Sequence, residues 1–125
     1  MEKVTGIGGV FFRAQDPDAL AQWYLDNLGV DRVPSDYDTP AWRQAAGETV
    51  FAPFSADTEY FGRSEQQWMV NFRVADLDAM IAQLRANGNE VTVDSEVYPN
   101  GRFARTHDPE GNPIELWEPA PSCCD

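Results

Sequence analysis

Few side chains in this sequence of 125 residues are suited to chemistry. The single histidine, His107, has a pKa range that suits proton transfer, but it stands beside a turn, where a solvated surface histidine is the alternative. The only cysteines, Cys123 and Cys124, are adjacent at the C-terminal end, so we expect free thiols there, with a redox or metal role as the alternative. No serine–histidine–acid constellation and no catalytic cysteine can be recognised.

Other side chains are better suited to binding than to catalysis. Arg102 and Arg105 are expected on one face of a strand, where they would hold an anionic ligand or pair with surface acids. Large aromatic residues would line a hydrophobic cleft or fill a core or dimer contact; these are Trp42, Tyr60, Phe61, Trp68 and Trp117. The glycines of residues 6–9 lack the spacing of a phosphate-binding loop.

The charge of the chain limits its partners. Nine basic residues against 21 acidic ones give a formal net charge of -12, which repels nucleic-acid phosphates and anionic membranes. The same charge would favour a cationic ligand, or would serve solubility alone. No apolar run approaches the ~20 residues that span a bilayer, and residues 1–4 do not resemble a signal peptide. We therefore expect a cytoplasmic protein that contacts neither nucleic acid nor membrane.

An internal repeat organises the chain. A shift of 60 positions aligns residues 10–13 with Val70–Arg73, and it also aligns Asp16 with Asp76 and Asn27 with Asn87. Residues 47–52 and 111–116 share a second pattern, a turn glycine followed by a strand. The repeat predicts two copies of one unit within a single domain. The predicted parts are unit one at about 4–54, a linker at about 55–65, unit two at about 66–119, and a disordered tail at 120–125.

Each unit is expected to open with a strand and a capped helix. Residues 7–14 are rich in strand-forming residues, and Asp16 followed by Pro17 is typical of a helix start. Glycine at position 29 is expected to end that helix, whose apolar stripe is Leu20, Trp23, Tyr24 and Leu28. In unit two Asp76 is the expected cap, Gly88 the expected stop, and the stripe is Leu77, Met80, Ile81 and Leu84.

Short strands are expected after each helix. They lie around residues 32–33, 42–45 and 49–52 in unit one, and 90–93, 102–106 and 113–117 in unit two. Each unit alone is too small to bury a sheet face well. The two units are therefore expected to share a core or to exchange strands with a second chain, which predicts a homodimer.

The sequence resembles the vicinal oxygen chelate superfamily, which includes glyoxalase I, bleomycin-resistance proteins and extradiol dioxygenases. The resemblance runs from residue 6 to residue 119, and rests on the repeat, on Asp16 to Tyr24, and on Asp108 to Leu116. It implies an α+β fold in which two tandem βαβββ units form a curved mixed sheet around a cavity, with helices on the outer face. The fold alone does not fix the function, because it carries unrelated chemistries.

Metal-dependent members of that superfamily hold a divalent ion with four residues. By resemblance, these positions fall on Gly9, Phe51, Met69 and Glu115 in this sequence. Only the carboxylate of Glu115 is a good ligand for such an ion. We therefore expect no metal site and no cofactor.

The same resemblance predicts a ligand pocket. If position 9 faces the cavity, alternation along the strands brings other residues to the same face. Glu115 would bind a ligand cation or move a proton there, or else would pair with Arg13, Arg73 or Arg105. Asn71 would hydrogen bond to a ligand or to backbone groups. The expected binding residues are Phe11, Trp42, Phe51, Met69, Asn71, Glu115 and Trp117, with Glu115 and His107 as catalytic candidates.

Two interpretations of function remain open at this point. One is a metal-free small-molecule binding protein, similar to the bleomycin-resistance proteins that sequester their ligand as dimers, with a cationic or aromatic ligand. The alternative is an enzyme of the same superfamily, a lyase, isomerase or dioxygenase, with an atypical or absent metal site. A module that binds a partner protein and has no ligand is a third possibility.

Overall fold

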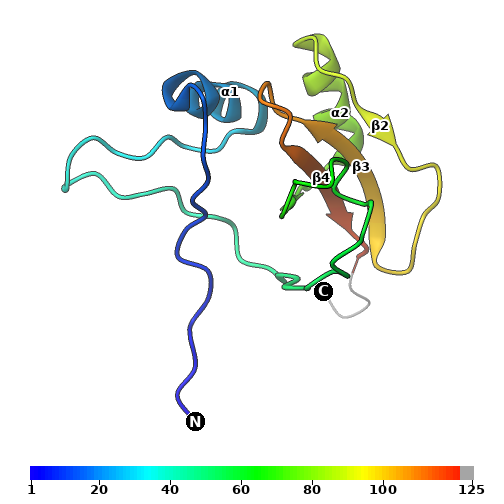
Figure 1. The fold of residues 1–125 in the computed structure, drawn as a ribbon, viewed down its shortest axis with the longest axis horizontal. Helices are drawn as coiled ribbons and strands as arrows, with labels where there is room; N and C mark the ends of the chain where they lie inside the picture. The colour runs from blue at the N-terminus through cyan, green and yellow to red at the C-terminus, as the bar shows by residue number, and fades with distance from the viewer. Residues whose placement is uncertain (122–125) are drawn as a thin grey trace.

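The computed structural model describes residues 1–121, which contain two helices and one mixed sheet (Figure 1). The helices are α1 (Pro17–Leu28) and α2 (Leu77–Ala86). The strands are β1 (Val70–Arg73), β2 (Thr92–Val93), β3 (Gly101–His107) and β4 (Pro113–Pro119), in the order β1-β4-β3-β2. β1 runs parallel to β4, whereas β3 is antiparallel to both of its neighbours. The α+β class is therefore confirmed; Cys123, Cys124 and the rest of residues 122–125 lie outside the described residues.

Both helices begin at the residues that the sequence predicts. The Asp16 carboxylate accepts a hydrogen bond from the Ala19 N–H at 3.1 Å, and Asp76 does the same for Ala79 at 3.0 Å. Each cap therefore satisfies an N–H that the first turn leaves without a helical partner. Gly29 ends α1 in the left-handed conformation, with φ +70°. Neither described helix is long and apolar enough to cross a bilayer.

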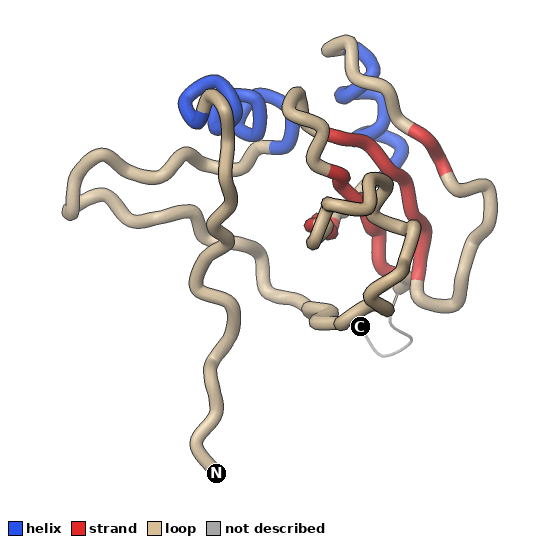
Figure 2. The backbone as a smooth tube through the Cα atoms, viewed as in Figure 1, coloured by secondary structure: helices blue, strands red, loops and turns tan. Residues whose placement is uncertain are grey.

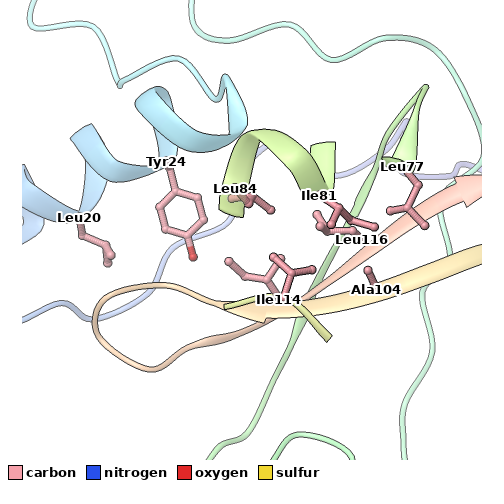
Figure 3. Close-up of a cluster of buried hydrophobic side chains, with 9 residues drawn as sticks. Leu20, Tyr24, Leu77, Ile81, Leu84, Ala104, Ile114 and Leu116 are labelled. Atoms are coloured by element: carbon pink, nitrogen blue, oxygen red, sulfur yellow. The ribbon is translucent and has the colours of Figure 1, made fainter. Parts of the chain in front are cut away.

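The hydrophobic core lies between the two helices and one face of the sheet (Figure 3). Ile114 and Leu116 of β4 are fully buried against Leu77 and Leu84 of α2. Leu20 and Tyr24 extend this core along α1. The helices also meet through the repeated asparagines, because the Asn87 side-chain amide donates to Asn27 Oδ1 at 3.0 Å. Both helices therefore belong to one core, although they come from different halves of the sequence.

The second half of the chain forms a complete βαβββ unit, and the first half does not. The strands expected in unit two are all present, as β1 to β4. The strands expected at residues 7–14, 32–33, 42–45 and 49–52 are absent, so that prediction is wrong for the single chain. Figure 2 shows these segments as long loops that extend away from the sheet and helices. A strand needs the backbone groups of a neighbouring strand, and within residues 1–121 no backbone ladder reaches these segments. The Arg73 side chain of β1 donates to the carbonyls of Ala45 and Glu48, but such side-chain contacts do not make a strand.

The pairing of the strands defines an open face, which is the face of the sheet opposite the helices. Asn71 of β1 and Arg105 of β3 are both paired with Glu115 of β4, and Phe103 and Arg73 are both paired with Trp117. Directly paired residues point to the same face, and neighbours along a strand alternate. Since Ile114 and Leu116 face the helices, the open face carries Asn71, Arg73, Phe103, Arg105, Glu115 and Trp117.

Candidate functional site

A polar group at the centre of the open face is organised around Glu115. The side-chain amide of Asn71 donates to Glu115 Oε1 at 2.7 Å, and the Tyr60 hydroxyl donates to Glu115 Oε2. Asn71 reaches Glu115 because β1 and β4 are adjacent and parallel, with these two residues in register. The Glu115 carboxylate thus has one donor on each oxygen, which is the usual way a partly buried acid is accommodated.

Tyr60 reaches this group from the connection between the two halves. Its ring lies beneath the guanidinium of Arg105, with the Arg105 Cζ atom 4.4 Å from the ring centroid. Arg105 Nη2 also donates to the Tyr60 carbonyl at 2.6 Å. Burial, followed by the hydrogen bond and the negative charge of Glu115, raises the pKa of Tyr60 to about 12. The phenol is therefore held neutral, as a hydrogen-bond donor to the carboxylate.

Aromatic side chains surround the polar group. Phe54 stacks on Tyr60 with centroids 5.8 Å apart, and Phe103 stacks on Trp117 at 6.4 Å. The Trp117 indole N–H donates to the Asn100 carbonyl at 2.8 Å, which fixes its ring on the sheet. A half-open hollow of about 240 Å³ runs beside Tyr60 toward β2; it is lined by Tyr60, Thr92, Val93, Asp94, Phe103, Ala104 and Arg105. Apolar walls with a few polar groups are typical of a small-molecule site.

The structure brings together four of the predicted binding residues. Asn71, Glu115 and Trp117 lie on the open face, and the Met69 sulfur lies 3.6 Å from Arg105 Nη2. Phe11 and Phe51 are instead 96% and 88% exposed, on the unpaired segments of the first half. Trp42, on the same unpaired part of the chain, is 39% exposed. These three aromatic residues do not line the site of the single chain.

The structure separates the two arginines and places His107 at the end of the open face. His107 is exposed at the end of β3, where it is paired with Pro113. By strand alternation it lies on the open face, two residues along the strands from the pair of Arg105 and Glu115. The expectation that Arg102 and Arg105 share a face is wrong, because residues three apart on a strand point to opposite faces. Arg102 pairs with Asp78 of α2 at 2.9 Å, the surface pairing that was the alternative. Of these two arginines, Arg105 is the one on the open face, which it shares with Arg73 of β1.

Two features of the site were not foreseen from the sequence. Tyr60 was expected only as one of several cleft aromatics, and no spacing rule relates it to Glu115, which is 55 positions away. Asp108 is fully buried, and accepts hydrogen bonds from the Tyr24 hydroxyl and the Asn112 amide, both at 2.7 Å. Burial and this carboxylate raise the pKa of Tyr24. Asp108 fixes the turn that aligns β4 with β3, and the density of turn residues around it was the available signal.

Comparison with known proteins identifies the family. A family model described as a glyoxalase-like domain matches residues 9–117. The chain belongs to this family. The resemblance to the vicinal oxygen chelate superfamily is thereby confirmed, and this glyoxalase-like domain has no match among curated proteins.

Solved structures share its fold at low sequence identity. TnmS3, an antibiotic binding protein from Streptomyces sp. CB03234, is 23% identical over 96% of this chain and 100% of that one, with a TM-score of 0.64. A glyoxylase/bleomycin resistance protein/dioxygenase domain from Frankia sp. EAN1pec is 18% identical over 94% and 100%, with a TM-score of 0.58. TioX from Micromonospora sp. ML1 is 18% identical over 87% and 92%, with a TM-score of 0.52. At these identities the likeness concerns the fold.

The metal that some superfamily members hold does not fit the residues of this glyoxalase-like domain. Of the four positions that the resemblance assigns, Gly9 and Phe51 offer no ligand atom, and Met69 offers a thioether beside a guanidinium. Both oxygens of Glu115 already accept hydrogen bonds. Within residues 1–121, no three histidine, cysteine, aspartate or glutamate side chains lie close enough to hold a metal ion. We derive no chemistry through a metal.

Proposed function

We propose that this glyoxalase-like domain is a metal-free small-molecule binding protein, and that its ligand lies on the open face of the sheet. The observation that carries the proposal is the group of Glu115, Asn71 and Arg105, set between aromatic side chains beside a half-open hollow. Such a group orients a ligand while the apolar walls supply most of the binding free energy. The similarity in fold to TnmS3, described as an antibiotic binding protein, supports a role of this kind.

The charges of the site favour an aromatic ligand over a simple cation. Arg105 covers the face of an aromatic ring in the present structure, and a ligand cation at Glu115 would lie near that guanidinium and be repelled by it. Asp94, which lines the hollow, and the acidic surface remain able to attract a basic group elsewhere on the ligand. The predicted ligand is therefore a planar aromatic compound, with or without a distant positive charge.

We also propose that a second copy of the chain completes the fold in a cytoplasmic homodimer. The unpaired segments of the first half expose several large apolar side chains, among them Phe11, Val33, Val50 and Phe51, each more than two-thirds exposed. Exposed apolar residues on unpaired, strand-forming segments are typical of an interface. In addition, β1 lies at the edge of the sheet, and no strand within residues 1–121 pairs with its other side. A partner whose segments pair along such edges would bring Phe11, Trp42 and Phe51 toward a shared cavity.

Binding of planar aromatic compounds to matched variants tests the proposed function. The panel is 2-naphthol, quinoline and 9-aminoacridine, with cyclohexanol as the non-aromatic control, measured by equilibrium dialysis. We expect at least one aromatic compound to bind, and Glu115→Ala to weaken it by about tenfold or more, as expected for loss of a charged hydrogen-bond partner. Glu90→Ala, which removes an exposed acid, should leave binding unchanged. Equal binding by the Glu115→Ala variant and the wild type would contradict the proposal.

A further inference from the structure

The segment that carries Tyr60 is held on the sheet by side chains rather than by strand pairing. Its backbone hydrogen bonds are internal, from Thr58 to Ser55, Gly62 to Glu59 and Gln66 to Arg63. Within residues 1–121, no backbone–backbone hydrogen bond joins residues 54–67 to the sheet. Tyr60 makes the connection instead, through Glu115 and Arg105. Moving this segment therefore breaks no part of the sheet, unlike moving a strand.

The surroundings of the Tyr60 ring are those expected for a bound aromatic molecule. Asn71 donates to Glu115 Oε1, and the Tyr60 hydroxyl donates to Glu115 Oε2. A hydroxyl of a bound molecule could take the place of the Tyr60 hydroxyl at Oε2. One face of the ring meets the flat guanidinium of Arg105. Beside it the hollow of about 240 Å³ continues over Phe103, which leaves space for rings beyond the first.

We propose that Tyr60 occupies the ligand's own place, and that the ligand is a planar aromatic compound with a phenolic hydroxyl that displaces it. This inference rests on the proposed binding function and specifies its ligand. A phenol is neutral at pH 7, so it donates a hydrogen bond to the Glu115 carboxylate and brings no positive charge to Arg105. A fused second ring of the ligand enters the hollow, which Tyr60 itself leaves open. Tyr60 is then a competitor that lowers the apparent affinity.

Affinity measurements with a phenol and its methyl ether test this inference. The probes are 2-naphthol and 2-methoxynaphthalene, which have the same rings, but only the first has a hydroxyl donor. We expect Tyr60→Ala to bind 2-naphthol about tenfold more tightly than the wild type, since one charge-assisted hydrogen bond no longer competes. Tyr60→Phe keeps the ring and should show a smaller gain, so the test holds even where the alanine variant folds poorly. Tyr37→Ala, at a fully exposed tyrosine, should match the wild type.

The outcomes separate this inference from the proposed function. Two results together would support displacement by a phenol. 2-Methoxynaphthalene should bind about tenfold more weakly than 2-naphthol, and the Tyr60 variants should bind 2-naphthol more tightly than the wild type. Equal affinity of the wild type and both Tyr60 variants, or equal affinity for the two probes, would overturn the inference while leaving small-molecule binding intact. Failure of every variant to bind either probe would also overturn it, and the wider panel with Glu115→Ala would then decide the proposed function.

Discussion

The two halves of this chain share a sequence pattern but differ in what they form alone. Residues 10–13 correspond to β1 in the repeat. β1 pairs in register with β4, but residues 10–13 have no strand partner within the described residues 1–121. The helices do not differ in this way. α1 and α2 have the same type of cap and lie in the same core.

This difference follows from where each element finds its hydrogen bonds. A helix satisfies its backbone within one segment, so Asp16 and the stripe behind it suffice to form α1. A strand takes its partners from other segments, and a repeated pattern cannot supply them unless the fold brings them into reach. The first half has the sequence pattern of strands, and we propose that a second copy of the chain supplies the strands with which it pairs.

The largest expected effect contrasts a core leucine with an exposed phenylalanine. Leu116→Ala should lower the free energy of unfolding by about 2–5 kcal/mol, because Leu116 is fully buried and its removal leaves a cavity. Phe51→Ala, at a side chain that is 88% exposed in the single chain, should change the stability of the dilute monomer by less than about 0.5 kcal/mol. Urea unfolding at low protein concentration measures both values. Similar losses for the two variants would show that the first half is already packed in the monomer.

The next effect concerns dimerisation. Phe11→Asp should weaken self-association by about 30-fold, or ~2 kcal/mol, because the dimer would bury the new charge. Tyr37→Asp introduces the same charge at another fully exposed aromatic and is the matched control. Sedimentation equilibrium should give twice the 14.0 kDa chain mass for the wild type and the control, and a concentration-dependent mass for Phe11→Asp. A wild type that sediments as a monomer would contradict the proposed second copy.

The helix caps should behave alike in the two halves. Asp16→Ala and Asp76→Ala each remove one side-chain acceptor from a first-turn N–H, and each should cost about 1 kcal/mol of stability. Asp31→Ala, at an exposed residue outside the helices, provides the control. The comparison is made by thermal unfolding under identical conditions. A large loss in one half only would show that the caps depend on their surroundings and not on local sequence alone.

A smaller effect concerns the pH dependence of stability. The pKa of Tyr60 is raised from 10.0 to about 12, so folding favours its protonated form. That stabilisation is complete below pH 10 and is lost as the pH rises toward 12. The stability difference between the wild type and Tyr60→Phe should therefore shrink over this window. Tyr24 is present in both proteins, so its contribution cancels in the comparison. A stability difference that stays constant from pH 10 to 12 would argue against the contact between Tyr60 and Glu115.

Sequence reasoning succeeded where the information is local. Caps, apolar stripes and turn residues located α1, α2 and the strands of the second half, and strand alternation placed Asn71, Glu115 and Trp117 on one face. It failed where distant segments must meet. Tyr60 reaches Glu115 through a connection without regular structure, and no periodicity encodes that contact. Strand alternation alone places Arg102 and Arg105 on opposite faces, so the sequence contains the information that separates them.

The most direct test of the central claim is a map of backbone amide chemical shifts during titration of the labelled protein with 2-naphthol. A ligand on the open face should produce its largest shifts at Tyr60, Asn71, Arg105 and Glu115, the residues that form the polar group. Shifts concentrated on the outer surface of α1, for example at the exposed Leu25, or no residue-specific shifts at all, would contradict a ligand site on the open face.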